Sequence, residues 1–203
     1  MLIQDIMQRG VVVVEPETRL AEAARLLQRR GIRHLPVLDQ GALVGIISDR
    51  DLKGAIASGA HLERSTAGDV MTRNVLTTAP MFAVEEAARV MVTERISALP
   101  VTEAGRLVGI VTETDILLLF VRAMGVLEPS SRLDVVLPDA PRALSRVVQI
   151  VEATGAAISS IMTLRGPITA MTEAVIRVAT INPGPAIKAL EAQGYTVRDS
   201  WRG

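Results

Sequence analysis

Apolar residues follow two kinds of spacing along the first part of the chain, and the two alternate in a fixed order. A helix stopped by Gly31 is predicted by apolar residues three or four positions apart, at Leu20, Ala23, Ala24 and Leu27. The short apolar runs at 35–38 and 43–47 predict two strands joined by a hairpin-like turn. An extended run at 11–14 precedes the helix, and a second helix begins near Ser48. The pattern therefore predicts a short strand, a helix, two strands and a helix.

This unit occurs twice without a gap, because matching residues return 64 positions later. Residues 32–37 match residues 96–101, and residues 43–51 match residues 107–115. Neither copy of a tandem unit usually buries its apolar face alone, so the pair is expected to form one body. Any cleft between the copies should then occur twice, around a pseudo-two-fold axis.

The repeat ends near residue 125, and a different pattern follows a linker that contains Glu128-Pro129-Ser130-Ser131. The spacing then predicts, in order, a strand at 133–137, a helix closed by Gly155, strands at 156–164 and 174–180, a helix from Asn182-Pro183 to Gly194, and a strand at 195–201. This order, βαββαβ, is the ferredoxin-like pattern, which by itself implies no activity. The predicted fold class is α/β in the broad sense (α+β), with domains at 1–62, 63–126 and 131–203.

Composition narrows the classes of function. Hydrophobic residues make up 49% of the chain but aromatic residues only 2%, so the core must be aliphatic. The net charge of zero and the scarcity of aromatic residues argue against a nucleic-acid partner. The absence of cysteine excludes disulfides, thiolate catalysis and cysteine-ligated metals, and the sequence shows no other metal-ligand spacing.

The apolar run Ile116–Val121 bears on location and on assembly. It is far shorter than the about 20 residues that cross a bilayer, and no signal peptide is visible, so we expect a cytoplasmic protein without a membrane partner. The run is apolar on every face, which a helix at the edge of a small domain cannot bury against its own sheet. It predicts a homodimer formed through this helix, and the alternative is that the C-terminal domain covers it.

Both copies end their second strand in a short polar motif, Ser48-x-x-Asp51 in the first and Thr112-x-x-Asp115 in the second. One interpretation is structural, because Ser or Thr followed by an acid three positions later is a helix capping box. The other is functional, because free N–H groups at a helix start suit a phosphate and the carboxylate suits a pair of ribose hydroxyls. The motif alone leaves both open.

The repeated unit resembles the cystathionine-β-synthase (CBS) domain, and the pair resembles a Bateman module. The resemblance covers residues 1 to about 125 and is carried by Arg33-His34-Leu35-Pro36-Val37, by residues 96–101, and by the Gly-x-x-(Ser/Thr)-x-x-Asp strand ends. It implies that AMP, ADP, ATP, S-adenosylmethionine or NAD binds between the copies. The ribose is then expected on Asp51 and Asp115, and the phosphate near Ser48 and Thr112.

Carried over residue by residue, the resemblance implies two unequal clefts. The first would contain Arg33, His34, Ser48, Arg50, Asp51, Ile96, Ser97 and Ala98. The second would contain Met7, Val12, Ile32, Ile110, Thr112 and Asp115. Because Arg33 and His34 favour an anionic phosphate, the first cleft is expected to bind the nucleotide more tightly, and occupation of the second stays open. His34 is interpreted as a packed or phosphate-side residue, since no nucleophile accompanies it.

Residues 131–203 resemble an ACT domain, a type of domain that binds amino acids in other proteins. The candidate ligand loop contains Asp139, Pro141, Arg142 and Leu144. Members of that family usually carry a glycine at the position of Arg142, so a purely structural or dimerising role is the alternative. The order of a CBS pair and an ACT-like domain resembles the acetoin-utilisation family of bacterial proteins.

The sequence thus predicts a regulatory protein that senses an adenosine nucleotide, has no enzymatic activity and needs no cofactor or metal. Ligand binding would reorient the ACT-like domain or signal to a protein partner. The alternatives are a ligand-free oligomerisation scaffold, a sensor of S-adenosylmethionine or NAD, and an amino-acid sensor that uses the ACT-like domain.

Overall fold

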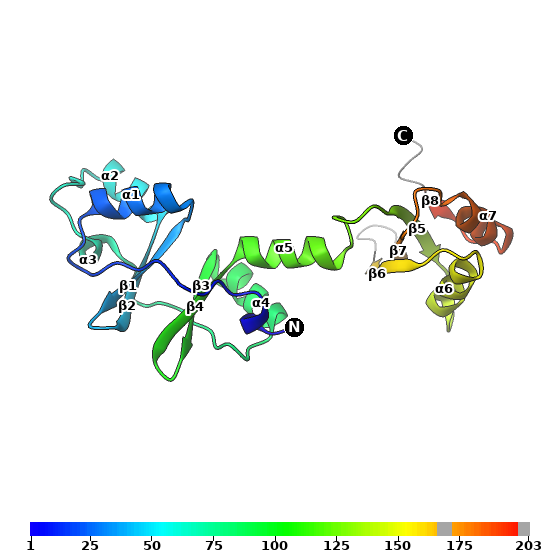
Figure 1. Cartoon of the computed structure of the whole chain (residues 1–203), viewed down its shortest axis with the longest axis horizontal. Helices are drawn as coiled ribbons and strands as arrows, with labels where there is room; N and C mark the ends of the chain where they lie inside the picture. Colours follow the sequence, from blue (N-terminus) through cyan, green and yellow to red (C-terminus); the bar gives the residue numbers. More distant parts are fainter. Residues whose placement is uncertain (166–171, 199–203) are drawn as a thin grey trace. The chain divides into compact units, whose positions relative to one another are not determined.

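The computed structural model describes residues 1–165 and 172–198, which divide into two compact units, Met1–Leu117 and Leu118–Gly203 (Figure 1). In the first unit, one copy contains α1 (Leu20–Arg30), β1 (His34–Asp39), β2 (Ala42–Ser48) and α2 (Asp49–Ala57). The other contains α3 (Ala67–Val70), α4 (Val84–Glu94), β3 (Ala98–Glu103), β4 (Arg106–Thr112) and the first residues of α5 (Glu113–Ala123). None of the described helices is long and apolar enough to cross a membrane.

The predicted helix of the first copy forms where its apolar spacing places it. Leu20, Ala23 and Leu27 of α1 are buried, and Gly31 ends the helix in the left-handed conformation (φ 62°) that glycine adopts without strain. In the second copy, Arg95 occupies the same position at the end of α4, with φ 57°. The two helices therefore end in the same backbone geometry with different side chains.

The strands of each copy form an antiparallel hairpin, β1 with β2 and β3 with β4. Both hairpins have an irregularity at equivalent points, between Val37 and Leu38 in one and between Val101 and Thr102 in the other. Leu35, Val37 and Ile47 are fully buried. The shared irregularity indicates that the two copies have the same internal register.

Isolated bridges show the pseudo-two-fold relation between the copies. Gln8 pairs with Ile110 of β4, and Thr72 pairs with Ile46 of β2, so the first segment of each copy adds to the hairpin of the other. Because the two residues of each bridge belong to different copies, the copies form one body, as the repeat predicted.

The extended run expected at 11–14 is not a strand. Only Val14 pairs, donating its N–H to the Pro36 carbonyl while its own carbonyl accepts from Leu38. Gly10, with φ 69°, turns the chain just before the run, and Pro16 lacks the N–H that a longer ladder would need. Sequence reasoning also missed the 3₁₀ turn η1 (Ile3–Asp5) and the short α3, whose Thr66-x-x-Asp69 signal was visible.

The second unit has the predicted element order. It contains β5 (Ser131–Leu137), α6 (Ala143–Ala153), β6 (Ile158–Arg165), β7 (Thr172–Val178), α7 (Gly184–Ala192) and β8 (Val197–Arg198). The strand order β6-β7-β5-β8 with antiparallel pairing is the ferredoxin-like topology. Alternate residues Leu133, Val135 and Leu137 of β5 pack against Val147 of α6 and Leu190 of α7. The end of the strand expected at 195–201 and the turn at 166–167 lie outside the described residues.

Candidate functional site

The larger cavity of the first unit has a volume of about 430 Å³ and lies between the two copies. Its wall is formed by the start of β1, the junction of β2 and α2, the segment 72–76 and the residues around the start of β3. It contains all eight residues expected in the first cleft: Arg33, His34, Ser48, Arg50, Asp51, Ile96, Ser97 and Ala98. The structure therefore brings together residues that are up to 65 positions apart in the sequence.

The two carboxylate oxygens of Asp51 are in different environments. Its Oδ2 accepts hydrogen bonds from the backbone N–H and the hydroxyl of Ser48, both at 2.7 Å, which is the predicted capping box. No described residue donates a hydrogen bond to its Oδ1. The cap thus holds the carboxylate in place at the edge of the cavity and leaves one oxygen able to accept hydrogen bonds from a ligand.

His34 connects the two copies at the wall of this cavity. Its Nε2 lies 2.9 Å from the hydroxyl of Ser97, which belongs to the other copy. Burial lowers the pKa of His34, and the neighbouring Arg33 lowers it further, while Asp51 opposes the shift. The lowered pKa favours the neutral imidazole near pH 7.

Several lining residues were not predicted. Arg95 adds a cation beside Arg33 and Arg50, and Thr72, Asn74 and Leu76 form the wall contributed by the segment before the second copy. The sequence contains a signal for Leu76, because it lies 64 positions after Val12, a residue expected in the other cleft. Thr72, Asn74 and Arg95 match residues that are expected in neither cleft, so the offset alone does not find them.

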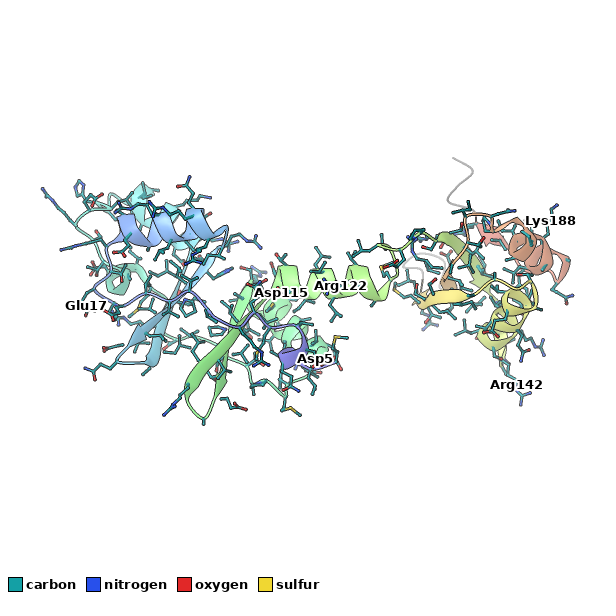
Figure 2. The ribbon with its side chains drawn as sticks, viewed as in Figure 1. Asp5, Glu17, Asp115, Arg122, Arg142 and Lys188 are labelled. Carbon is teal, nitrogen blue, oxygen red and sulfur yellow. The ribbon has the colours of Figure 1, made fainter. Side chains whose placement is uncertain are left out.

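The equivalent cavity on the other side of the pair is smaller, about 190 Å³. Of the residues expected there, four line it: Val12, Ile32, Ile110 and Thr112. Met7 does not line it but packs against Gly109, where an added Cβ would lie 2.7 Å from the Met7 sulfur. Asp115 does not line it either. Figure 2 shows Asp115 at the start of α5.

Asp115 is held on both of its oxygens. Its Oδ2 accepts from the N–H and the hydroxyl of Thr112, at 2.8 and 2.6 Å. Its Oδ1 accepts from the side-chain amide of Gln8 at 2.9 Å. On the same side, Arg33 donates to the hydroxyl of Thr114 at 3.0 Å. The two clefts thus have the same helix cap, but they differ in whether a described side chain donates a hydrogen bond to the second oxygen of the aspartate.

The second unit has a cavity of about 870 Å³ at the loop before α6. Asp139, Arg142 and Leu144 of the candidate loop line it, together with Arg146, and Pro141 does not. Arg142 has φ 62°, so it adopts the left-handed conformation at the position where glycine was expected. Its side chain is exposed and labelled in Figure 2.

Helix α5 has no buried residue along its whole length. Three of its large apolar side chains are exposed, by 60% at Leu117, 43% at Leu118 and 50% at Phe120. Among residues 1–165 and 172–198, no group of three or more His, Asp or Glu side chains is arranged to hold a metal ion.

Comparison with known proteins identifies the repeated unit. A family model for the CBS domain matches residues 3–58 and 67–122, which together make up more than half of the chain. An uncharacterized protein of Methanocaldococcus jannaschii, MJ1225, is 36% identical over 59% of this chain and 47% of its own length. Inosine-5'-monophosphate dehydrogenase of Korarchaeum cryptofilum is 38% identical over 53% of this chain. The chain spans only 22% of that enzyme.

Solved structures resemble the same part of the chain. The CBS domain pair of protein MJ0100, in complex with 5'-methylthioadenosine and S-adenosyl-L-methionine, is 37% identical, with a TM-score of 0.56 over 59% of this chain and 95% of that one. A putative acetoin utilization protein (AcuB) from Vibrio cholerae is 30% identical, with a TM-score of 0.57 over 62% of this chain and 94% of that one.

Proposed function

Because the chain belongs to the CBS domain family, we propose that it is a regulatory protein that binds an adenosine ligand between its two CBS copies. The observation that carries this proposal is the Oδ1 of Asp51, to which no described residue donates a hydrogen bond and which the Ser48 cap holds at the edge of the larger cavity. A carboxylate oxygen in that state accepts hydrogen bonds from a ribose diol. The neighbour MJ0100, whose CBS pair holds two adenosine compounds, supports the same class of ligand.

The size and the lining of the cavity agree with a nucleotide. Its volume of about 430 Å³ falls in the range of small-molecule sites, about 300–1,000 Å³. Apolar Ile46 and Ile96 line it beside the polar groups, so a base has an apolar surface to contact. An adenosine moiety suits this combination of an apolar wall for the base and an acceptor oxygen for the ribose.

The arginines of the cavity support a phosphorylated ligand of the AMP, ADP or ATP type. Arg33, Arg50 and Arg95 line it, beside the carboxylates of Asp49, Asp51 and Glu94 and the imidazole of His34. A phosphate there gains charge-assisted hydrogen bonds. S-adenosylmethionine and NAD are the alternatives within the same ligand class.

We propose no enzymatic activity for the chain. Its role would be to convert ligand binding into a change in the packing of the two copies, since Arg33 and His34 touch both the cavity and the opposite copy. The ACT-like domain, at 131–203, or a protein partner would respond to this change. A homodimer through the exposed apolar face of α5 is part of the same proposal.

A second candidate function is supported by the cavity of the other unit. Arg142, Arg146 and Asp139 line it together, which supplies cations for a carboxylate and an anion for an amine. An amino acid carries both groups. This alternative predicts stabilisation by amino acids, whereas a ligand-free scaffold predicts no stabilisation by either class of compound.

The test is a thermal-unfolding titration with AMP, ADP, ATP, S-adenosylmethionine, NAD and the common amino acids. A ligand at 100 times its dissociation constant adds about 2.7 kcal/mol to the unfolding free energy, so the melting temperature should rise with an adenosine compound. Asp51→Ala should remove that rise. Asp115→Ala is the matched control, because it removes an equivalent helix cap but should keep the ligand response.

If no compound raised the melting temperature of the unmodified protein, the sensor proposal would be wrong and the ligand-free scaffold would remain. A ligand response lost equally in both variants would instead show that Asp51 has no special role.

A further inference from the structure

The two cavities between the copies share many matching positions. Thr72 of the larger cavity matches Gln8 of the smaller one, and Ser48 matches Thr112. The difference that bears on a ribose is that Asp51 lines the larger cavity whereas its counterpart Asp115 does not line the smaller one. The difference requires a local cause, since both aspartates occupy the same place in the same helix cap.

The backbone around both aspartates is equivalent. Gln8 exchanges two backbone hydrogen bonds with Ile110, at 2.9 and 3.0 Å, and Thr72 exchanges two with Ile46, both at 3.0 Å. The side chains of Gln8 and Thr72 therefore start from matching points beside the two helix starts. What differs is their length.

Gln8 is long enough to reach across the cleft, and its amide donates to Oδ1 of Asp115 at 2.9 Å. Thr72 has no such reach, and no described residue donates to Oδ1 of Asp51. Asp115 is half-buried and already holds the Thr112 cap on its other oxygen, so the amide occupies the remaining acceptor. A ribose diol would have to displace this charge-assisted hydrogen bond before it could bind.

A second contact narrows the same cleft. Arg33 crosses from the first copy and donates to Thr114 at 3.0 Å. The equivalent positions in the larger cavity are Ser97 and Arg50, for which no hydrogen bond to each other is present in the described structure. The cavity with these two contacts is the smaller one, about 190 Å³, and the cavity without them is about 430 Å³.

We infer that Gln8 closes the second cleft, so that the chain binds one adenosine ligand rather than two. This inference rests on the proposed function and adds the residue that determines stoichiometry. The side chain of Gln8 takes the place that a ribose would occupy on Asp115, and Thr72 leaves that place open on Asp51. Replacing Gln8 by the residue of the matching position should therefore open the second cleft.

The test is isothermal titration calorimetry of the full chain with AMP and with 5'-methylthioadenosine, which share the ribose diol and differ in the phosphate. The unmodified protein should bind one ligand per chain, and Gln8→Thr should bind two. In the Gln8→Thr background, Asp51→Ala and Asp115→Ala should each return the stoichiometry to one. Gln4→Thr, the same substitution at an exposed position away from both cavities, should leave it at one.

Two ligands per chain in the unmodified protein would overturn the inference and leave the proposed function standing. A Gln8→Thr variant that melts like the unmodified protein and still binds one ligand would also overturn the inference alone. No heat of binding from either compound, in any variant, would overturn the proposed function and this inference together.

Discussion

At the scale of single residues, the chemistry of the larger cavity depends on groups that serve two purposes. Asp51 caps α2 with one oxygen and presents the other, and His34 joins the copies through Ser97 while facing the cavity. Dual use of this kind couples ligand binding to packing, because a ligand that attracts either side chain also acts on a structural contact.

The lowered pKa of His34 makes a prediction about acid stability. Since burial and Arg33 hold the folded-state pKa below 6.5, the unfolded chain binds more protons than the folded chain between that lowered value and 6.5. The unfolding free energy should therefore fall as the pH is lowered through this window. Urea unfolding followed from about pH 7.5 to about pH 5 measures it.

The variant that tests this is His34→Gln, which keeps a polar partner for Ser97 and should flatten the pH dependence in that window. His61→Gln is the matched control, because His61 lies exposed between the copies. If His34→Gln kept the full pH dependence, another group would have to cause it.

At the scale of elements, the hairpins explain the glycine in each Gly-x-x-(Ser/Thr)-x-x-Asp motif. The segment before each copy pairs with the hairpin of the other and places a methionine against that glycine. An added Cβ on Gly45 would lie 2.3 Å from the sulfur of Met71 and 3.1 Å from its Cβ. The motif's glycine is thus required by the packing between copies rather than by a turn.

Gly45→Ala should therefore destabilise the protein by about 1–3 kcal/mol, the usual cost of overpacking a filled site. Gly54→Ala is the control within the same copy, since nothing lies within 4 Å of its added Cβ. In the interior of α2 this change should stabilise by up to about 1 kcal/mol. Chemical denaturation of both variants measures the two effects, and equal effects would contradict the packing explanation.

At the scale of the whole molecule, α5 begins in one compact unit and ends in the other. Its exposed apolar residues form the surface through which we propose that two chains associate. A change in how the CBS copies pack would move the start of α5, because its first turn contains the Thr112-x-x-Asp115 cap.

Leu117→Glu should shift the protein from dimer to monomer in light scattering coupled to size-exclusion chromatography, because it places a charge in a desolvated interface. Val92→Glu provides the control, as Val92 is 77% exposed on α4 and lies outside α5. A monomeric unmodified protein, or a dimer that survives Leu117→Glu, would remove α5 from the interface.

The elements and the larger cavity could be predicted far better than the smaller one. All eight residues that the resemblance to the CBS domain implies for the first cleft line one cavity. In the second cleft, Met7 and Asp115 lie away from the cavity wall. Met7 is used for packing against Gly109, and Asp115 is engaged by Gln8, and neither contact has a signal in local spacing.

The sequence by itself determined the duplication, the element order and both helix caps, because these depend on periodicity and on residues three or four positions apart. Only the tertiary structure decided which aspartate has an oxygen to which no residue of the described ranges donates a hydrogen bond. That outcome depends on whether a side chain 107 positions away in the sequence is long enough to span the cleft, as Gln8 is and Thr72 is not.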